Sequence, residues 1–256
     1  MTSHRAITTA VGANFVIIAF AIILGLGTAG KPSRYFGEGR FTTAISCGQL
    51  LAVAFFSGRM FLARRPLAPP IGSISAAWVW GLIAAGFAFL AADDAFEIHE
   101  QLDRIIHATF HIQETAWTDR LDDMIIAVYG LLGFSVLWLF RREILLFRPM
   151  RKPMAGGFLC SFASVVCDTI SNDEQLLVWL CCDPATAKQL NSWFAVGDGA
   201  FTLLAEGLFL AAFYLSYRAA DESPAHAVER TSFERDGPCD GSIYSPARTP
   251  PPSGES

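Results

Sequence analysis

The stretch "ITTAVGANFVIIAFAIILGLGTA", residues 7–29, contains no charged residue. A helix needs roughly 20 such residues to cross the hydrocarbon core of a bilayer, which is about 30 Å thick. Other segments along the chain have a comparable length and apolar character. The predicted spans are residues 7–29, 41–63, 75–92, 121–140, 154–170 and 196–217. The sequence therefore predicts an all-α, polytopic membrane helix bundle with about six transmembrane helices.

The composition agrees with a membrane protein. Of 256 residues, 52% are hydrophobic and 17% are charged, whereas soluble domains carry about 25% charged residues. The net charge is -5, and no basic patch with interleaved aromatic residues is present, which argues against nucleic acid as a partner. We expect the lipid bilayer to be the main partner. The six cysteines form no CxxC pair, so neither a disulfide framework nor a thiolate zinc site is predicted.

Three segments need a further interpretation. Residues 7–29 could instead be a secretory signal, because His4 and Arg5 precede the apolar run and "GTAG" follows it. The run "LLVWLCC", residues 176–182, is too short to span and is expected at the interface or as a re-entrant piece. The tail, residues 220–256, is rich in Pro, Ser, Gly and charge, and we expect it to be disordered.

Lys and Arg near the helix ends predict the orientation, because cytoplasmic loops carry an excess of them. One face collects Arg5, Arg64, Arg65, Arg141, Arg142, Arg148, Arg151, Lys152 and Arg218. The other face has fewer basic residues, and many acids dilute them. The first face is therefore predicted to be cytoplasmic, which places both the N- and the C-terminus inside.

In this orientation, polar side chains from several helices fall at the same outer level. An ionisable group within the hydrocarbon costs several kcal/mol unless it is paired or hydrated, so such groups usually face the bundle interior or a watery cavity. Glu206, in "LLAEGLF", is the deepest. The candidate metal or cation ligands are Asp93, Asp94, Glu97, His99, Glu100, Asp122, Asp123, Asp168 and Glu206, with Asp103, His107, His111 and Asp198 as secondary candidates. They predict an acidic cavity open to the outside.

The stretch "FLAADDAFEIHEQLDRIIHATFH", residues 89–111, carries the largest share of these residues. At about 100° per residue, one sector of a helix holds Asp93, Glu97, Glu100, Asp103, His107 and His111, and the opposite side holds Ile98, Leu102, Ile105 and Ile106. A bend or break is expected before Trp117, because a straight helix would be about twice as long as the bilayer is thick. The distal residues, from His107 onward, are interpreted as the wet face of an interfacial helix. The proximal residues could join the shared site.

The spacing within this stretch also allows a metal. Asp93 with Glu97, and His99 with Asp103, are four residues apart, which is a spacing that metal ligands on one helix use. A mixed carboxylate and imidazole set suits Zn, Mn or Fe, and a purely carboxylate set suits Ca or Mg. A divalent metal is thus a possible cofactor, and the sequence leaves open whether one is bound.

The motif "DDAFEIHE", residues 93–100, resembles the D-[DE]-x4-H-E pattern at the outer end of a helix in various uncharacterised bacterial multi-pass membrane proteins. The matching residues are Asp93, Asp94, His99 and Glu100. This resemblance implies the bacterial inner membrane and no particular activity. The chain also has a weak similarity to alkaline ceramidase-like membrane hydrolases. It departs from them because the late helix has Asp198 and Glu206 in place of His-x-x-x-His.

Three functions remain open at this point. The first is a membrane protein whose outward-facing acidic and histidine cavity binds or passes a cation or proton. The second is a membrane-embedded metal-dependent hydrolase acting on a lipid, with His99 or Glu100 as the base. The third is a structural or interaction subunit in which the acids only satisfy one another. Whether the protein is an enzyme is therefore not decided by the sequence.

Overall fold

The computed structural model describes residues 3–37, 39–66, 70–71, 74–110, 121–172, 177–179 and 183–222. The principal helices are α1 (Ser3–Ala29), α2 (Phe41–Arg64), α3 (Trp78–Phe96), α4 (Ile98–Phe110), α5 (Leu121–Leu139), α7 (Arg151–Ser171) and α9 (Pro184–Asp221). The short elements are α6 (Arg141–Ile144), the 3₁₀ helices η1 (Pro32–Tyr35) and η3 (Arg148–Met150), and the paired strands β1 (Pro70–Ile71) and β2 (Ile74–Ser75). The fold is all-α, as predicted. One compact unit covers Met1–Asp221, and most of the predicted tail lies outside the described residues.

Several of these helices have the length and composition of membrane spans. Those that qualify are Ser3–Thr28, Phe41–Arg64, Trp78–Phe96, Arg148–Ser171 and Pro184–Asp221. The remaining predicted span, 121–140, coincides with α5, whose apolar segment among the described residues is the shorter Val128–Leu139. Large apolar side chains point outward from the peripheral helices: Leu131 of α5 is 65% exposed and Phe162 of α7 is 67% exposed. Such surfaces suit lipid, as expected for a multi-pass membrane protein.

Two of the differences between predicted and observed helix boundaries bear on the polar residues. The last span was expected at 196–217, but α9 has 38 residues and begins at Pro184, so it is about 57 Å long. Its first turns are polar, and hydropathy alone therefore gave no reason to include them. Asp183 caps the helix by accepting hydrogen bonds from the backbone N–H (2.9 Å) and hydroxyl (2.6 Å) of Thr186. Likewise, α3 continues past the predicted end at residue 92 to Phe96.

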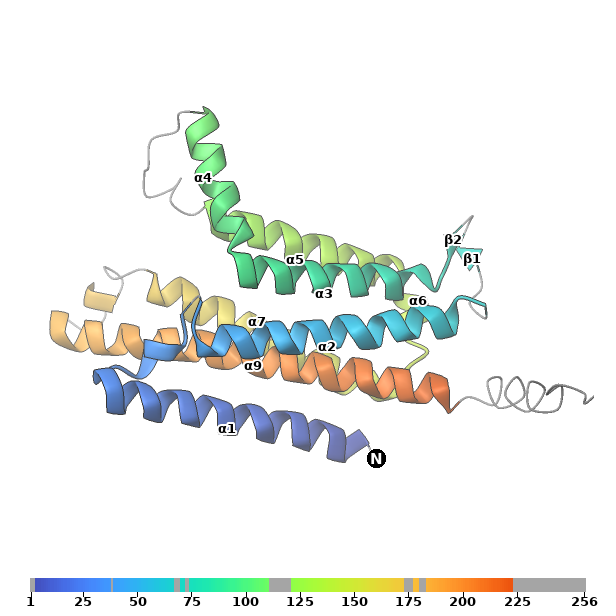
Figure 1. Ribbon diagram of the computed structural model, residues 1–256, viewed down its shortest axis with the longest axis horizontal. Coiled ribbons are helices and arrows are strands. Elements are labelled where there is room, and N and C mark those ends of the chain that lie inside the picture. The colour runs from blue at the N-terminus through green and yellow to red at the C-terminus, as the bar shows by residue number, and fades with distance from the viewer. Residues whose placement is uncertain are drawn as a thin grey trace, which may run out of the picture. The chain divides into compact units, whose positions relative to one another are not determined.

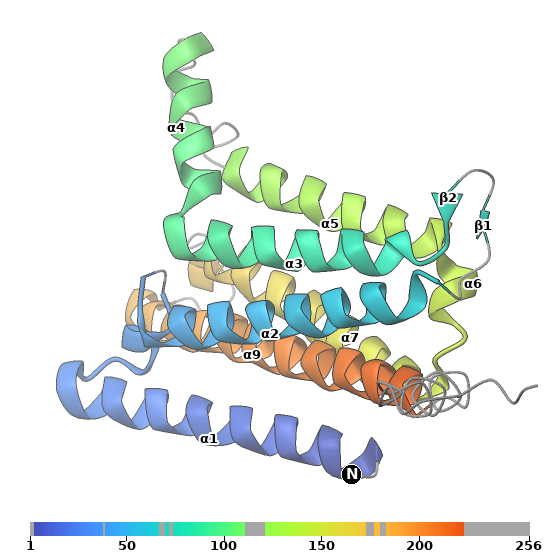
Figure 2. The same ribbon diagram turned by 45° about the vertical axis from the view of Figure 1, so that its right-hand side comes forward.

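Consecutive long helices alternate in direction, as Figures 1 and 2 show. The start of α1, at Ser3, and the end of α9, at Asp221, therefore lie at the same end of the bundle. We call this the arginine end, because the last turn of α2, α6 and the first turn of α7 bring their basic residues there; these include Arg64, Arg141, Arg142 and Arg151. The opposite end, where α3 meets α4, is the α4 end. That the arginine end is cytoplasmic remains a prediction.

Helix α9 is the central element of the bundle. It packs against α1, α2 and α7, while α3 packs on α2. Small residues allow the close approach of α7 and α9: a Cβ added to Gly157 would lie 2.5 Å from the ring of Phe209. In the same way, Gly199 of α9 accommodates Phe36, which follows η1. This packing places side chains of α1 and α2 against the middle of α9.

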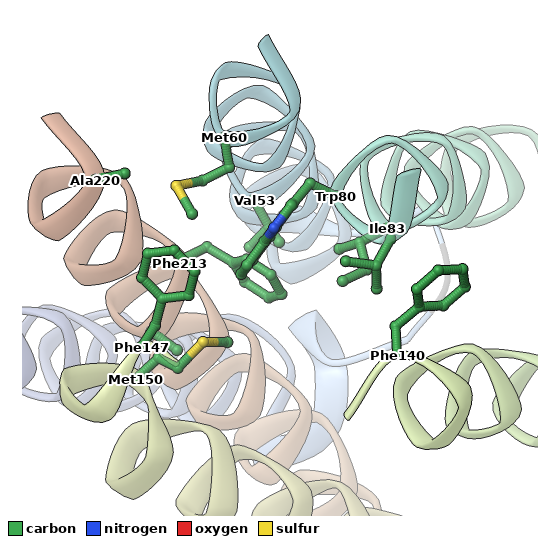
Figure 3. Packing of buried hydrophobic residues seen from close by; sticks show 11 residues of the cluster. Val53, Met60, Trp80, Ile83, Phe140, Phe147, Met150, Phe213 and Ala220 are labelled. Atoms are coloured by element: carbon green, nitrogen blue, oxygen red, sulfur yellow. The ribbon is translucent and has the colours of Figure 1, made fainter. Parts of the chain in front are cut away.

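A hydrophobic core fills the arginine half of the bundle. Figure 3 shows Trp80 of α3 and Phe213 of α9 pointing toward each other between the helices, with Phe147 and Met150 beside them. Trp80 is 0% exposed and its ring packs edge-on against both Phe147 and Phe213. A second, smaller apolar cluster on α1 and α9 includes Leu203. The polar side chains described below lie between these two clusters and toward the α4 end.

The chain breaks between α3 and α4, before Trp117 as expected. Glu97 adopts the left-handed conformation (φ 52°, ψ 46°), which ends α3 and lets α4 leave at a steep angle to it (Figures 1 and 2). The exposed side of α4 carries large apolar side chains, with Ile105 60% and Phe110 70% exposed, beside the exposed polar residues Gln101 and Arg104. Its acids and histidines are more buried, and His99 is only 7% exposed. That this apolar side lies on the membrane surface remains a prediction.

Candidate functional site

Glu206 is a buried carboxyl group in the apolar part of α9, with 6% of its surface exposed. The hydroxyl of Ser46, on α2, donates a hydrogen bond of 2.6 Å to its Oε1. Its Oε2 is buried and accepts no hydrogen bond from the residues that the structure describes. Ser46 lies about 8 Å along the axis from the start of α2 at the α4 end. The carboxyl is therefore within the bundle, and nearer to the α4 end along α2.

Two amide side chains lie beside this carboxyl. Asn14 of α1 and Gln49 of α2 bind each other reciprocally: Gln49 Nε2 donates to Asn14 Oδ1 at 2.7 Å, and Asn14 Nδ2 to Gln49 Oε1 at 3.4 Å. The pair rests on Gly207, where an added Cβ would overlap the amide nitrogen of Asn14 and lie 3.3 Å from Gln49 Oε1. Three helices thus meet at a polar layer next to Glu206. Glycine is required there because no other residue leaves room for the amides.

A second contact leads from this layer toward α3. The single hydrogen of the Cys47 thiol has two acceptors within reach, Asp94 Oδ2 and the carbonyl oxygen of Ala91, each 3.5 Å from the sulfur. Cys47 follows Ser46 directly on α2. Asp94 is close enough to both Cys47 and Glu206 to interact with them electrostatically. The predicted residues Asp94 and Glu206 therefore do lie in one neighbourhood, with Ser46 and Cys47 between them.

Asp93 and His99 form the corner between α3 and α4. Asp93 Oδ1 accepts from the backbone N–H of His99 at 2.9 Å, and Oδ2 lies 3.0 Å from the ring Nδ1 of His99. Because an ionised carboxylate only accepts, Nδ1 carries the proton when Asp93 is ionised. Both side chains are at least nine-tenths buried. The pair fixes the direction in which α4 begins, so at least part of its role is structural.

Two further pairs lie along α4. His107 Nδ1 is 3.0 Å from Asp103 Oδ1, but the geometry directs its hydrogen bond to the Asp103 carbonyl oxygen at 3.1 Å. His107 Nε2 and Asp103 Oδ1 are buried without a hydrogen bond among the described residues. Glu100 forms an ion pair with Arg104 one turn later. The distal histidine was predicted to face water, whereas the structure places it 14% exposed, on the inner side of α4.

The remaining predicted acids belong to other contacts. Asp198 of α9 accepts a 2.6 Å hydrogen bond from Ser164 of α7, whose hydroxyl also lies 2.8 Å from that of Thr202. Asp168, in the last turn of α7, accepts from Asn172, the residue that follows the helix, at 3.2 Å. Neither residue is hydrogen-bonded to Glu206 or to the α3–α4 corner in the part of the chain that the structure describes.

The predicted residues thus divide into several small groups. Within the described ranges, no group of three or more His, Cys, Asp or Glu side chains is arranged to hold a metal ion. Glu97 is the C-cap of α3, and its left-handed backbone conformation ends that helix. Asp122 and Asp123 lie in the first turn of α5, and His111 lies outside the described residues. Binding of Zn, Mn or Fe accordingly stays a prediction.

Sequence reasoning missed a buried ion pair at the arginine end. Glu143 of α6 is 3% exposed and accepts from Arg64 Nε and Nη2, at 2.8 and 3.2 Å, and from the indole of Trp80 at 3.3 Å. The guanidinium of Arg64 also lies over the ring of Phe147, 5.7 Å from its centre. The signal was a single acid within the basic run "RREI", which is more commonly a solvated surface charge.

Residues 9–187 match the family described as Domain of unknown function (DUF8692). The chain belongs to this family. No curated protein and no solved structure matches it. The matched part of this DUF8692 protein contains Ser46 and Asp94, whereas Asp198 and Glu206 lie beyond its last residue. The family description assigns no activity, so a function has to be argued from the geometry.

Proposed function

We propose that this membrane protein binds a cation, either a proton or a metal ion, at Glu206 and exchanges it with solution at the α4 end. The observation that carries the proposal is that this carboxyl group is buried with few hydrogen-bond partners. It is buried in an apolar segment, accepts one hydrogen bond from Ser46, and has a second oxygen without a partner among the described residues. A buried carboxylate needs a counter-charge or several donors. One hydroxyl supplies too little, and a bound cation supplies the rest.

The distribution of polar groups favours exchange at the α4 end. Cys47 and Asp94 lie beside the Glu206 layer, and Asp93 with His99 form the corner at that end. These residues place hydrogen-bonding and titratable groups on the side of the layer that faces the α4 end. Negative side chains in this position attract cations.

The arginine end is, by contrast, closed. The core around Trp80 and Phe213 fills that half of the bundle, and the Arg64–Glu143 ion pair joins α2 to α6 beyond it. A cation moving that way would meet packed aromatic rings and then arginine side chains. If the arginine end is cytoplasmic, as the distribution of basic residues predicts, the site opens to the outside. The resemblance of "DDAFEIHE" to bacterial membrane proteins supports the bacterial inner membrane as its location.

The experiment compares thermal unfolding of the detergent-purified protein and of Glu206→Gln over a range of pH and of Na⁺, Mg²⁺, Ca²⁺ and Zn²⁺ concentrations. A ligand that binds only the folded state raises the unfolding temperature as its concentration rises. We expect at least one cation, the proton included, to stabilise the parent protein and not Glu206→Gln. Asp221→Asn is the matched control, because Asp221 is an exposed carboxyl at the end of the same helix. An equal response in the parent protein and Glu206→Gln contradicts the proposal.

A structural role is the second candidate, and one observation favours it. Several of the acids already have partners: Asp93 with His99, Asp198 with Ser164 and Glu143 with Arg64. In a purely structural protein, Glu206 and Ser46 would form one more such link between α2 and α9. This alternative predicts that the stability of Glu206→Gln responds to every cation as the parent protein does. The lipid hydrolase would in addition require a bound metal, which metal analysis of the purified protein tests.

A further inference from the structure

We infer that the cation bound at Glu206 is a proton and that the Ser46 hydroxyl is the hydrogen-bond partner that sets how readily the carboxyl takes it up. This inference rests on the proposed function and names the ion for the same site. Two observations support it: the small number of oxygen atoms around the carboxyl, and the hydrogen bonds that these atoms already accept.

The oxygen atoms in contact with Glu206 are few compared with the coordination shell of Ca²⁺ or Mg²⁺. Ca²⁺ takes about six to eight oxygens and Mg²⁺ about six. Glu206 contributes its two carboxyl oxygens and Ser46 one hydroxyl. The amide oxygens of Asn14 and Gln49 each already accept a hydrogen bond from the other side chain, and Asn14 Nδ2 also donates to the carbonyl oxygen of Ala10 at 3.2 Å. A metal ion would have to disrupt this pair, whereas a proton needs only the unpartnered Oε2.

The neighbouring groups also favour a proton. Helix α1 presents the neutral Asn14, α2 presents Ser46 and Cys47, and α3 presents Asp94. In the described part of the chain, the titratable side chains that interact with Glu206 are Cys47 and Asp94. The nearest charge is thus another carboxylate. A proton on Glu206 removes the repulsion between two negative charges and leaves a neutral group in the apolar interior.

The exchange itself is a simple acid–base step. The Ser46 hydroxyl donates its hydrogen to Glu206 Oε1 at 2.6 Å when the carboxyl is ionised. When the carboxyl is protonated, the hydroxyl can turn and accept. For each proton bound, Glu206 gains one hydrogen and loses one negative charge, and a hydronium ion of the solution is left as water. No electron transfer or second reactant is involved.

The test uses dicyclohexylcarbodiimide on the full-length protein in detergent, with the site of modification mapped by mass spectrometry. The protonated carboxyl adds its O–H across one C=N bond, and the adduct rearranges to a stable N-acylurea without a leaving group. We expect modification at Glu206 that decreases as pH rises and does not change with Na⁺, Mg²⁺ or Ca²⁺ at constant pH. Ser46→Ala should move the half-modification point to higher pH by about one unit, since its hydroxyl favours the ionised form. Ser57→Ala, at a buried α2 serine whose hydroxyl has no recorded partner, should not move it.

The outcomes separate this inference from the proposed function. Protection of Glu206 by a metal ion at constant pH would overturn the proton assignment and leave a cation site at Glu206. Modification that depends on neither pH nor metal ions would overturn both. If the reagent does not reach Glu206, proton uptake during a pH step decides: the parent protein should take up about one proton more than Glu206→Gln. Equal uptake by the two proteins would contradict the inference.

Discussion

Ser46 of α2 and Glu206 of α9 are 160 residues apart in the chain and share a hydrogen bond of 2.6 Å inside the bundle. The contact joins a helix near the start of the compact unit to its last helix. It also lies between the aromatic core on the arginine side and the acids Asp93 and Asp94 on the α4 side. Both the packing of the bundle and the chemistry of the proposed site therefore depend on this pair.

Removing the Ser46 hydroxyl should destabilise the protein modestly. Interhelical hydrogen bonds in membrane proteins contribute about 0.6 kcal/mol on average and up to about 1.7. We expect Ser46→Ala to lower the free energy of unfolding within that range, measured by reversible denaturation in detergent micelles. Ser57→Ala is the control on the same helix, because the hydroxyl of Ser57 is buried without a recorded hydrogen bond. A larger loss for Ser57→Ala than for Ser46→Ala would show that the contact contributes nothing.

Gly207 should not tolerate a side chain. A Cβ at this position would overlap Asn14 Nδ2, and the reciprocal amide pair would have to move. Overpacking of this kind typically costs about 1 to 3 kcal/mol. We therefore expect Gly207→Ala to lower the unfolding temperature, whereas Gly86→Ala should not, since no atom lies within 4 Å of a Cβ at Gly86. Equal unfolding temperatures for the two variants would mean that the α1–α9 contact is looser than described.

The ion pair at the arginine end should be among the most sensitive positions. Removing one partner of a buried pair leaves the other charge without compensation and costs about 3 to 5 kcal/mol. Glu143→Ala should therefore strongly lower the thermal stability in detergent. Arg142→Ala, at the exposed neighbouring residue, should change it little. If both variants unfold at the temperature of the parent protein, Glu143 does not hold α2, α3 and α6 together.

The first turn of α9 should open in acid. Hydrogen bonds from the side chain and backbone of Thr186 hold the pKa of Asp183 below its usual value. Asp183 therefore stabilises the folded turn above its unfolded-state pKa, and that stability is lost as pH falls through the lower folded-state pKa. We expect the exchange protection of the Thr186 amide to decrease over this acidic range. Asp183→Asn retains a capping group and should show no such pH dependence; the same dependence in Asp183→Asn would exclude Asp183 as the cause.

The orientation of the bundle can be measured by thiol labelling. Single cysteines at Lys152, in the first turn of α7, and at Gln101, on α4, lie at opposite ends. A membrane-impermeant reagent should modify Gln101→Cys from outside and Lys152→Cys only after the cytoplasmic side is exposed. The parent protein gives the background from its own cysteines. The reverse pattern would place the acidic residues on the cytoplasmic side and overturn the outward-facing site.

Much of the helix bundle was predictable because long apolar runs have few alternatives. Residues 41–63 and 154–170 lie within α2 and α7 as described. The beginning of α9 was not predictable from hydropathy, since the residues after Pro184 are polar and become helical by continuity with the apolar part and through the Asp183 cap. The break at Glu97 was expected only in general terms. Its position depends on how Asp93 binds His99, which a helical projection does not reveal.

The candidate site was predictable only as a set of residue types at one depth. Burial within an apolar segment singled out Glu206, and the structure places it inside the bundle. Helical periodicity could not say which acids share a neighbour, because that depends on how helices distant in sequence pack. It therefore did not separate Asp94, near Glu206, from Asp168, which binds the residue that follows its own helix. Glu143 was missed for the same reason, as its partner Arg64 is 79 residues away.

Infrared difference spectroscopy tests the central claim most directly, because the C=O stretch of a protonated carboxyl is separate from the bands of a carboxylate. Spectra of the parent protein, Glu206→Gln and Asp221→Asn would be recorded between acidic and alkaline pH, with and without metal ions. Binding of a proton at Glu206 predicts a protonated-carboxyl band that decreases as pH rises, is insensitive to metal ions, and is missing only in Glu206→Gln. The same band in Glu206→Gln, or no pH-dependent band in the parent protein, would contradict proton binding at Glu206.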